Sequence, residues 1–192
     1  MAAARALTPP LRAATFETLI GLMAVTGLRL GEAVDLDRVD VDLADGALHV
    51  RARQTKQREV PLHQSTTEAL GEYPRLRDQH SPKTRSFFVA RPGRGLTRQA
   101  VWGTFPQLIR QAGLEGRGER ARPRPHDLRH SFAVRTLLDW HHAGADIDAR
   151  LPLLSTYLGH VGPESSYWSL QAVPELLALV ARELDGALGG QR

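Results

Sequence analysis

Three short segments of alternating apolar and polar residues lie close together in the first third of the chain, and they constrain the fold most strongly. They are VDVDL (39–43), ALHVRAR (47–53) and EVPL (59–62). Alternation with a period of two is typical of strands that bury one face, and the turn sequence ADG separates the first two segments. TKQR (55–58) connects the second to the third tightly, so the sequence predicts an antiparallel meander of three strands.

Helical patterns flank this small sheet. Residues 11–25 repeat apolar side chains at the spacing of an amphipathic helix, the pair TG interrupts the pattern, and a second helix runs on through Leu36. From Ser65 the sequence STTE forms a capping box that opens another helix. Pro74 is expected to kink or end that helix, because proline lacks the N–H group that a helix interior uses.

The second half of the chain is predicted to be mainly helical. FFVA (87–90) supplies one further strand, and GLEGRGERARPRP (113–125) reads as a loop because it is rich in glycine, arginine and proline. Helices are expected over residues 97–111, 126–140, 151–158, 163–170 and 174–188. The predicted class is therefore α+β and mainly α, with a small antiparallel three-stranded sheet, as one domain over residues 1–188 and a tail at 189–192.

The basic residues are concentrated in the middle of the chain. Residues 51–135 hold 18 Arg and Lys against 7 acidic residues, a net charge of +11, whereas residues 1–50 carry −3 and residues 136–192 carry −4. A segment with this charge suits a polyanion, because neutralised phosphates release their condensed counterions. Any single arginine of the segment is as well explained by a solvated surface.

Composition excludes several other classes. None of the 192 residues is cysteine, which removes disulfide scaffolds, thiol catalysis and thiolate metal sites. No apolar run reaches the ~18 residues of a membrane span, and the N-terminus lacks an apolar core followed by a cleavage site. The expected location is the cytoplasm, with no membrane partner.

Arg29, Glu32 and Lys56 are the first candidate site residues. Arg29 and Glu32 are three residues apart in TGLRLGE, so on a helix they share a face and the carboxylate orients the guanidinium. An ordinary surface ion pair has the same spacing. Lys56 is predicted at the tip of the hairpin, from where its side chain reaches a ligand, although a solvated turn lysine would look the same.

A second group of candidates lies in PHDLRHSFAVRTLL. His126, Arg129 and His130 fall on one face of a helix that is otherwise rich in Leu, Phe and Val. An unpaired buried charge is expensive, so these side chains need partners, and one of the histidines is expected to be a core histidine with satisfied hydrogen bonds. Further along, His160 precedes a short predicted helix with four hydroxyl groups, on Ser165, Ser166, Tyr167 and Ser169.

Together these residues describe a site for an anionic transition state that is held without a metal or another cofactor. Arginine forks match phosphate oxygens, and a histidine or lysine donates a proton to a leaving oxygen. A phosphodiester that is attacked by a hydroxyl gathers negative charge, which such a cluster stabilises.

Four motifs in one order resemble the tyrosine recombinases, the family of phage integrases and Xer-type bacterial resolvases. They are TGLRLGEAVDL, QTK followed by VPLH, HDLRHSFA and LLSTYLGHVGPESSYW, and they cover nearly the whole chain. The resemblance implies a catalytic domain that cleaves one strand of double-stranded DNA through a 3′-phosphotyrosine and rejoins it to another duplex. It also implies self-association on DNA through the C-terminal helix, although that helix would equally pack on its own core.

The resemblance assigns roles to individual residues. It implies that Arg29, His126, Arg129 and His160 hold the scissile phosphate, and that Lys56 protonates the 5′-oxygen. Glu32 and His130 would support them, with His130 as the structural histidine.

The nucleophile position departs from the family pattern. The family places a tyrosine nine residues after the last histidine, and here that position is Ser169. Serine is shorter and lacks the phenolic acidity of tyrosine, whose pKa is about 10. Tyr167 is the possible alternative, but on a helix its side chain points about 200° away from that of residue 169. The hairpin around Lys56 is also short, and the family's N-terminal DNA-clamping domain is expected to be absent.

Three functions therefore remain open. The first is a recombinase catalytic domain whose strand cleavage is impaired, and the second is an inactive DNA-binding relic or decoy of that family. The third is a metal phosphohydrolase that uses His126 and Asp127 with His141 and His142, which the lack of further ligands at suitable spacing disfavours.

Overall fold

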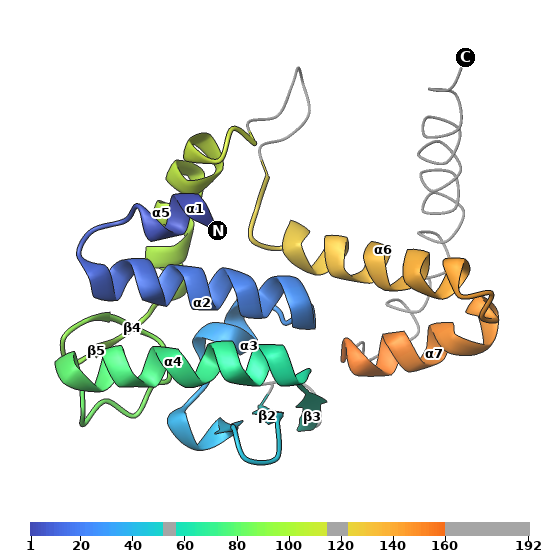
Figure 1. Cartoon of the computed structure of the whole chain (residues 1–192), viewed down its shortest axis with the longest axis horizontal. Coiled ribbons are helices and arrows are strands. Elements are labelled where there is room, and N and C mark those ends of the chain that lie inside the picture. Colours follow the sequence, from blue (N-terminus) through green and yellow to red (C-terminus); the bar gives the residue numbers. More distant parts are fainter. Residues whose placement is uncertain (52–56, 115–122, 160–192) are drawn as a thin grey trace. The chain divides into compact units, whose positions relative to one another are not determined.

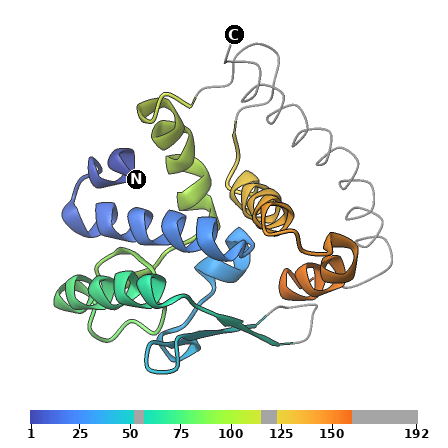
Figure 2. The same cartoon turned by 45° about the vertical axis from the view of Figure 1, so that its right-hand side comes forward.

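The computed structural model describes residues 1–51, 57–114 and 123–159 (Figures 1 and 2). The chain forms two compact units, Met1–Phe132 and Ala133–Arg192. The first unit contains helices and two small sheets, and the described part of the second is helical. The predicted α+β class, mainly α, is confirmed. No helix within the described ranges is long and apolar enough to cross a membrane.

The first unit begins with helices and continues into a three-stranded sheet. Its helical elements before the sheet are α1 (Ala2–Arg5), α2 (Pro10–Thr26), α3 (Leu30–Val34) and the 3-10 turn η1 (Arg38–Asp40). The strands are β1 (Val41–Asp42), β2 (Ala47–Val50) and β3 (Arg58–Pro61). They pair antiparallel in the order β1-β2-β3, with Val41 opposite Leu48 and Val50 opposite Arg58, so the predicted meander is confirmed.

The rest of the first unit follows this sheet. Helix α4 (Gln64–His80) leads to a second, two-stranded sheet of β4 (Val89–Arg91) and β5 (Arg94–Gly95), and then to α5 (Arg98–Gln111). Helix α6 (Asp127–His142) starts in the first unit and ends in the second, which also contains α7 (Ile147–Tyr157). The helices predicted at 163–170 and 174–188 lie outside the described residues.

Helices α2 and α4 lie side by side and form the centre of the first unit (Figure 1). Leu19 and Met23 of α2 are almost fully buried, as apolar side chains at helical spacing should be. A buried polar contact joins the same elements to β4: the Tyr73 hydroxyl lies 3.0 Å from Thr15 Oγ1 and accepts a 3.1 Å hydrogen bond from the Val89 amide. The burial of Tyr73 raises the pKa of its hydroxyl.

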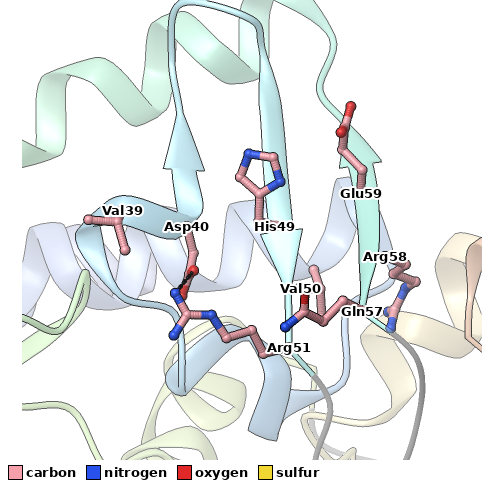
Figure 3. A pocket seen from close by; sticks show the side chains of 8 residues that line it. All are labelled: Val39, Asp40, His49, Val50, Arg51, Gln57, Arg58 and Glu59. Atoms are coloured by element: carbon pink, nitrogen blue, oxygen red, sulfur yellow. Dashed lines mark hydrogen bonds and ion pairs between the residues drawn. The ribbon is translucent and has the colours of Figure 1, made fainter.

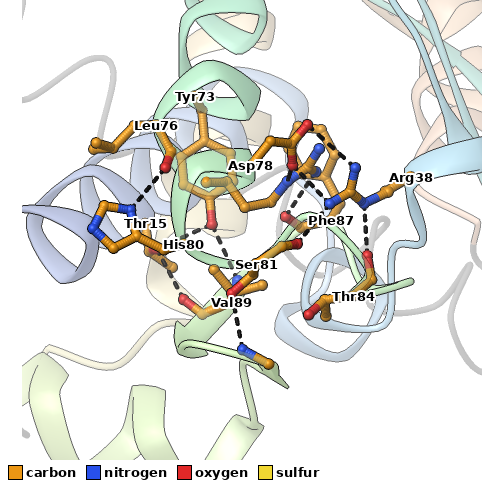
Figure 4. A network of polar contacts seen from close by, with 12 residues as sticks. Thr15, Arg38, Tyr73, Leu76, Asp78, His80, Ser81, Thr84, Phe87 and Val89 are labelled. Carbon is orange, nitrogen blue, oxygen red and sulfur yellow. Dashed lines mark hydrogen bonds and ion pairs between the residues drawn. The ribbon is translucent and has the colours of Figure 1, made fainter.

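A polar network joins α4 to η1 and to the residues just before β4 (Figure 4). Arg38 of η1 donates to both carboxylate oxygens of Asp78, at 3.2 and 2.7 Å. Arg77, only 3% exposed, donates to Asp78 and to the Phe87 carbonyl, and its guanidinium carbon lies 5.3 Å from the centroid of the Phe87 ring. A buried arginine with these partners is satisfied and holds α4 in place.

Several boundaries differ from those predicted. The N-cap of α4 is His63, whose Nδ1 accepts from the Ser65 amide, so the capping box predicted to open at Ser65 is wrong. The helix also continues past Pro74 to His80, because Tyr73 and Arg77 on its inner face are buried on both sides of the proline. In the second unit, α7 begins at Ile147, earlier than predicted, since the Asp146 carboxylate caps it by accepting from the Ala149 amide.

Candidate active site

A left-handed turn between α2 and α3 brings Arg29 into position. Gly27 has φ 62° and ψ 20°, a conformation that glycine adopts without steric cost, and its amide caps α2 by donating to the Met23 carbonyl. The chain then reverses into α3, whose N-cap is Arg29. The TG interruption seen in the sequence is therefore the turn that sets the start of the site.

Glu32 is the centre of a cluster of arginines. Its side chain is only 6% exposed. It accepts from the Arg29 amide at 2.9 Å and from Arg29 Nη1 at 3.1 Å, so the contact predicted between these two residues is present. Burial raises the pKa of Glu32, but the hydrogen bonds from Arg58 and Arg29 outweigh it and hold that pKa below its ordinary value. Glu32 is therefore a buried, ionised carboxylate that orients arginines.

Arg58 is a member of the cluster that sequence reasoning missed. It is the first residue of β3, and its two Nη atoms donate to the two carboxylate oxygens of Glu32, each at 2.9 Å. This is the bidentate fork that arginine forms best with a carboxylate. The sequence analysis placed Arg58 in a tight turn. Only the strand register, which sets Arg58 opposite Val50, indicates its place in the site.

Arg129 of α6 belongs to the same cluster. It is 5% exposed, and its Nη1 donates to the Gly27 carbonyl at 2.9 Å. Burial, and next the positive charge of Arg29, lower the pKa of Arg129 to about 10, while Glu32 acts in the opposite direction. Arg129 therefore stays charged at neutral pH.

The two histidines of the HDLRH motif are both exposed. His126 lies just before α6 and within the electrostatic reach of Arg129 and Arg29. Loss of solvation, and next the charge of Arg129, lower its pKa below the ordinary value. His130 is exposed as well, so neither histidine lies in the core, where one of them was expected. The buried face of α6 instead follows Arg129, Ala133 and Leu137, at four-residue spacing, and His130 is one residue away from that line.

Helix α3 is also attached to the start of α5. Arg98 donates to Asp35 at 2.6 Å, and its guanidinium lies directly over the backbone of Gly31. A Cβ atom at residue 31 would come within 2.7 Å of Arg98 Cζ. A side chain at residue 31 would therefore require the Arg98 guanidinium to move.

An open hollow of about 480 Å³ lies beside the β2–β3 hairpin (Figure 3). Arg51, just after β2, donates to the buried Asp40 carboxylate at 2.5 Å, and His49 pairs with Glu59 across the two strands. Among the described residues, no group of three or more His, Asp or Glu side chains is arranged to hold a metal ion.

The remaining candidates fall where the structure gives no description. Lys56, His160, Tyr167 and Ser169 lie outside the described residues, as does the C-terminal helix expected to mediate self-association. Among the predicted site residues that are described, the structure brings together Arg29, Glu32 and Arg129, with His126 nearby. It adds Arg58 to them and leaves both histidines exposed.

Solved structures of site-specific recombinases have a similar fold. XerH recombinase bound to difH substrate in a pre-cleavage complex superimposes with a TM-score of 0.67 and 27% identity, over 88% of this chain and 46% of that one. XerA recombinase has the same TM-score, 0.67, at 24% identity over 93% of this chain and 59% of that chain, which supports the fold alone.

Sequence comparison defines the family. Residues 2–164 match the phage integrase family, and this chain belongs to it. The protein y4rE of Sinorhizobium fredii, named for an integrase or recombinase function, is 44% identical over 182 residues, which is 92% of this chain and 58% of the relative. Tyrosine recombinase XerC of Pseudomonas aeruginosa is 38% identical over 122 residues, 63% of this chain and 38% of XerC. The chain thus spans little more than half the length of y4rE.

Proposed function

We propose that this chain binds double-stranded DNA and that its arginine cluster holds a phosphodiester for the strand transfer of a site-specific recombinase. One observation carries the proposal: Arg29 and Arg58 donate to a single carboxylate, Glu32, and Arg129 lies within its electrostatic reach. Three guanidinium cations and one carboxylate leave two net positive charges. A phosphodiester carries one negative charge and gains a second when an oxyanion attacks it, so the cluster matches the transition state better than the ground state.

The charge distribution and the relatives support DNA as the ligand. Residues 51–135 carry a net charge of +11, which suits a phosphate backbone. The XerH structure holds difH substrate, and the Tn1549 transposon integrase, whose fold is similar, was solved with circular intermediate DNA. Binding of this chain to DNA should weaken steeply as salt rises, because each phosphate contact releases counterions.

In the proposed reaction a hydroxyl group of the protein loses its proton to water while its oxygen attacks the scissile phosphorus, and the bond to the 5′-oxygen breaks. Arg29 and Arg129 bind the non-bridging oxygens, with His126 beside them, while Lys56 gives its proton to the departing 5′-oxygen. His160 completes the phosphate contacts. The reverse reaction, with a 5′-hydroxyl of another strand, rejoins the DNA and frees the protein. These roles of Lys56 and His160 rest on the family motifs.

We further propose that strand cleavage is impaired because Ser169 occupies the nucleophile position. A serine hydroxyl ends close to the backbone and is less acidic than a phenol, so it is both a shorter attacking group and a poorer leaving group. The alternative function, an inactive DNA-binding relic or decoy, follows from the same substitution. It predicts binding without cleavage even after the tyrosine is restored.

The experiment combines a restored nucleophile with capture of the covalent intermediate. The chain and its Ser169→Tyr variant are incubated with a library of nicked duplexes of randomised sequence, and protein-linked DNA is read on a denaturing gel. The parent should give no adduct, Ser169→Tyr should give one, and adding Arg29→Ala should abolish it. An adduct from the parent that Tyr167→Phe removes would move the nucleophile to Tyr167. A Ser169→Tyr protein that shifts DNA on a native gel yet forms no adduct would favour the decoy.

A further inference from the structure

Arg58 is bound more completely to Glu32 than Arg29 is. Arg58 engages both carboxylate oxygens at 2.9 Å, and its side chain is 14% exposed. Arg29 has one side-chain bond to Glu32, at 3.1 Å, and is 38% exposed. The two arginines therefore donate unequally to one carboxylate, and the more buried guanidinium, that of Arg58, makes more of the side-chain hydrogen bonds.

The unequal sharing determines how much positive charge remains around Arg29. A carboxylate with one arginine partner forms a bidentate pair with it and cancels its charge. With Arg58 present, the fork geometry of Glu32 is already occupied, and Arg29 contacts Glu32 through one Nη atom and its backbone amide. Without Arg58, both carboxylate oxygens of Glu32 would be available to Arg29, and the two side chains would form a bidentate ion pair.

We propose that Arg58 is a positioning residue for the phosphate site, which acts through Glu32 to keep Arg29 oriented and the cluster positively charged. This inference rests on the proposed function, because it assumes that the cluster binds a phosphate-like anion. Arg58 links residues that are 26 positions apart, from the first residue of β3 to α3, so it also fixes the base of the hairpin against the site. It requires no contact between Arg58 and the anion itself.

The test measures binding of inorganic sulfate to the full chain, since sulfate resembles phosphate but keeps its charge between pH 5 and 8. Arg58→Ala should weaken binding at pH 8 by about tenfold, the scale of one hydrogen bond to a charged group. Arg75→Ala removes the same charge from an exposed position of α4 and should leave binding unchanged. Arg58→Gln keeps a hydrogen-bond donor but not the charge, which guards against a folding defect in Arg58→Ala.

The decisive readout is a double-mutant cycle with Glu32→Gln. If Arg58 acts through Glu32, then Glu32→Gln should restore sulfate affinity in the Arg58→Ala protein but should not raise it in the parent, where it removes the group that orients Arg29. A purely structural role would make the double variant worse than Arg58→Ala. Equal effects of Glu32→Gln in both backgrounds would show that Arg58 acts independently of Glu32 and would overturn the proposal.

Lowering the pH provides a second readout. The charged groups that act on Glu32 are Arg29, Arg58 and Arg129. In Arg58→Ala, Glu32 loses the bonds that hold its pKa down, so it should take up a proton as the pH falls, and sulfate affinity should recover more than in the parent. No such recovery would count against the proposal. If the parent itself bound no sulfate, the proposed phosphate site would fail instead.

Discussion

Arg129 donates a hydrogen bond to the backbone carbonyl of Gly27, 102 residues earlier in the chain. The bond joins the first turn of α6 to the end of α2, two residues before Arg29. Two motifs that are far apart in the sequence are thereby held together by a side chain and a main-chain atom. The distance between the two candidate phosphate-binding arginines thus depends on this contact.

Replacing Arg129 should remove both a charge and this contact. In the Ser169→Tyr background, Arg129→Ala should lower the initial rate of covalent adduct formation by about 10²-fold or more, because a preorganised charge on the transition state is lost. Arg129→Lys should recover only part of the rate, since lysine lacks the planar fork. Arg135→Ala, an exposed residue of the same helix, serves as the control. A normal rate in Arg129→Ala would remove Arg129 from the site.

The lowered pKa of His126 predicts how anion binding depends on pH. Below its ordinary pKa of 6.5 the imidazole stays neutral until the pH reaches the lowered value, and only then does it add a positive charge. Sulfate affinity of the parent should therefore begin to rise only at a pH below 6.5. His126→Gln should remove this rise, whereas His80→Gln, at an exposed position of α4, should keep it. Identical titrations of all three proteins would contradict the prediction.

Tyr73→Phe should destabilise the first unit. The change leaves the buried Val89 amide without the hydroxyl that accepts its proton, which costs about 1–3 kcal/mol of unfolding free energy. The parent should also lose stability above pH 10, because the pKa of Tyr73 is raised in the folded state and the unfolded chain releases the proton first. Urea unfolding at pH 8 and at higher pH measures both effects. The variant should lack the alkaline loss that comes from this hydroxyl.

Two glycine substitutions form a matched pair. Gly103→Ala, inside α5 with no atom within 4 Å of the added Cβ, should stabilise the protein by about 0.5–1 kcal/mol through helix propensity. Gly31→Ala should give less or none of this gain, because its Cβ displaces the Arg98 guanidinium and breaks the contact with Asp35. Denaturant midpoints compare the two. An equal gain at both positions would mean that Arg98 moves away at no cost.

The sequence allowed most of the fold to be predicted where the signal is local. Alternation gave the three-strand meander, and the TG pair marked the turn at Gly27, because period and backbone freedom are properties of adjacent residues. The N-cap of α4 was missed, since His63 is an unusual cap and the STTE sequence offered a stronger one. The pairing of β4 with β5 was also missed, because each strand is too short to show alternation.

The site was predictable as far as the family motifs reach. Arg29, Glu32 and Arg129 lie together as their motifs suggested, but Arg58 became visible only in three dimensions. Its partner Glu32 is 26 residues away, and the register of β3 decides which way its side chain points. The place of His130 was misjudged for a related reason: three residues on one helical face did not reveal which line of that face is buried.

Gly27 makes the geometry of the arginine cluster a property of the main chain. Its left-handed conformation, with φ 62°, ends α2 and turns the chain toward Arg29. The same conformation leaves its carbonyl in position to accept from Arg129. Any side chain at residue 27 would have to pay the left-handed penalty of about 1–2 kcal/mol or rotate the peptide away from Arg129. Random mutagenesis of the chain should therefore accept almost no substitution at this position, even though glycine itself contributes no functional group to the site.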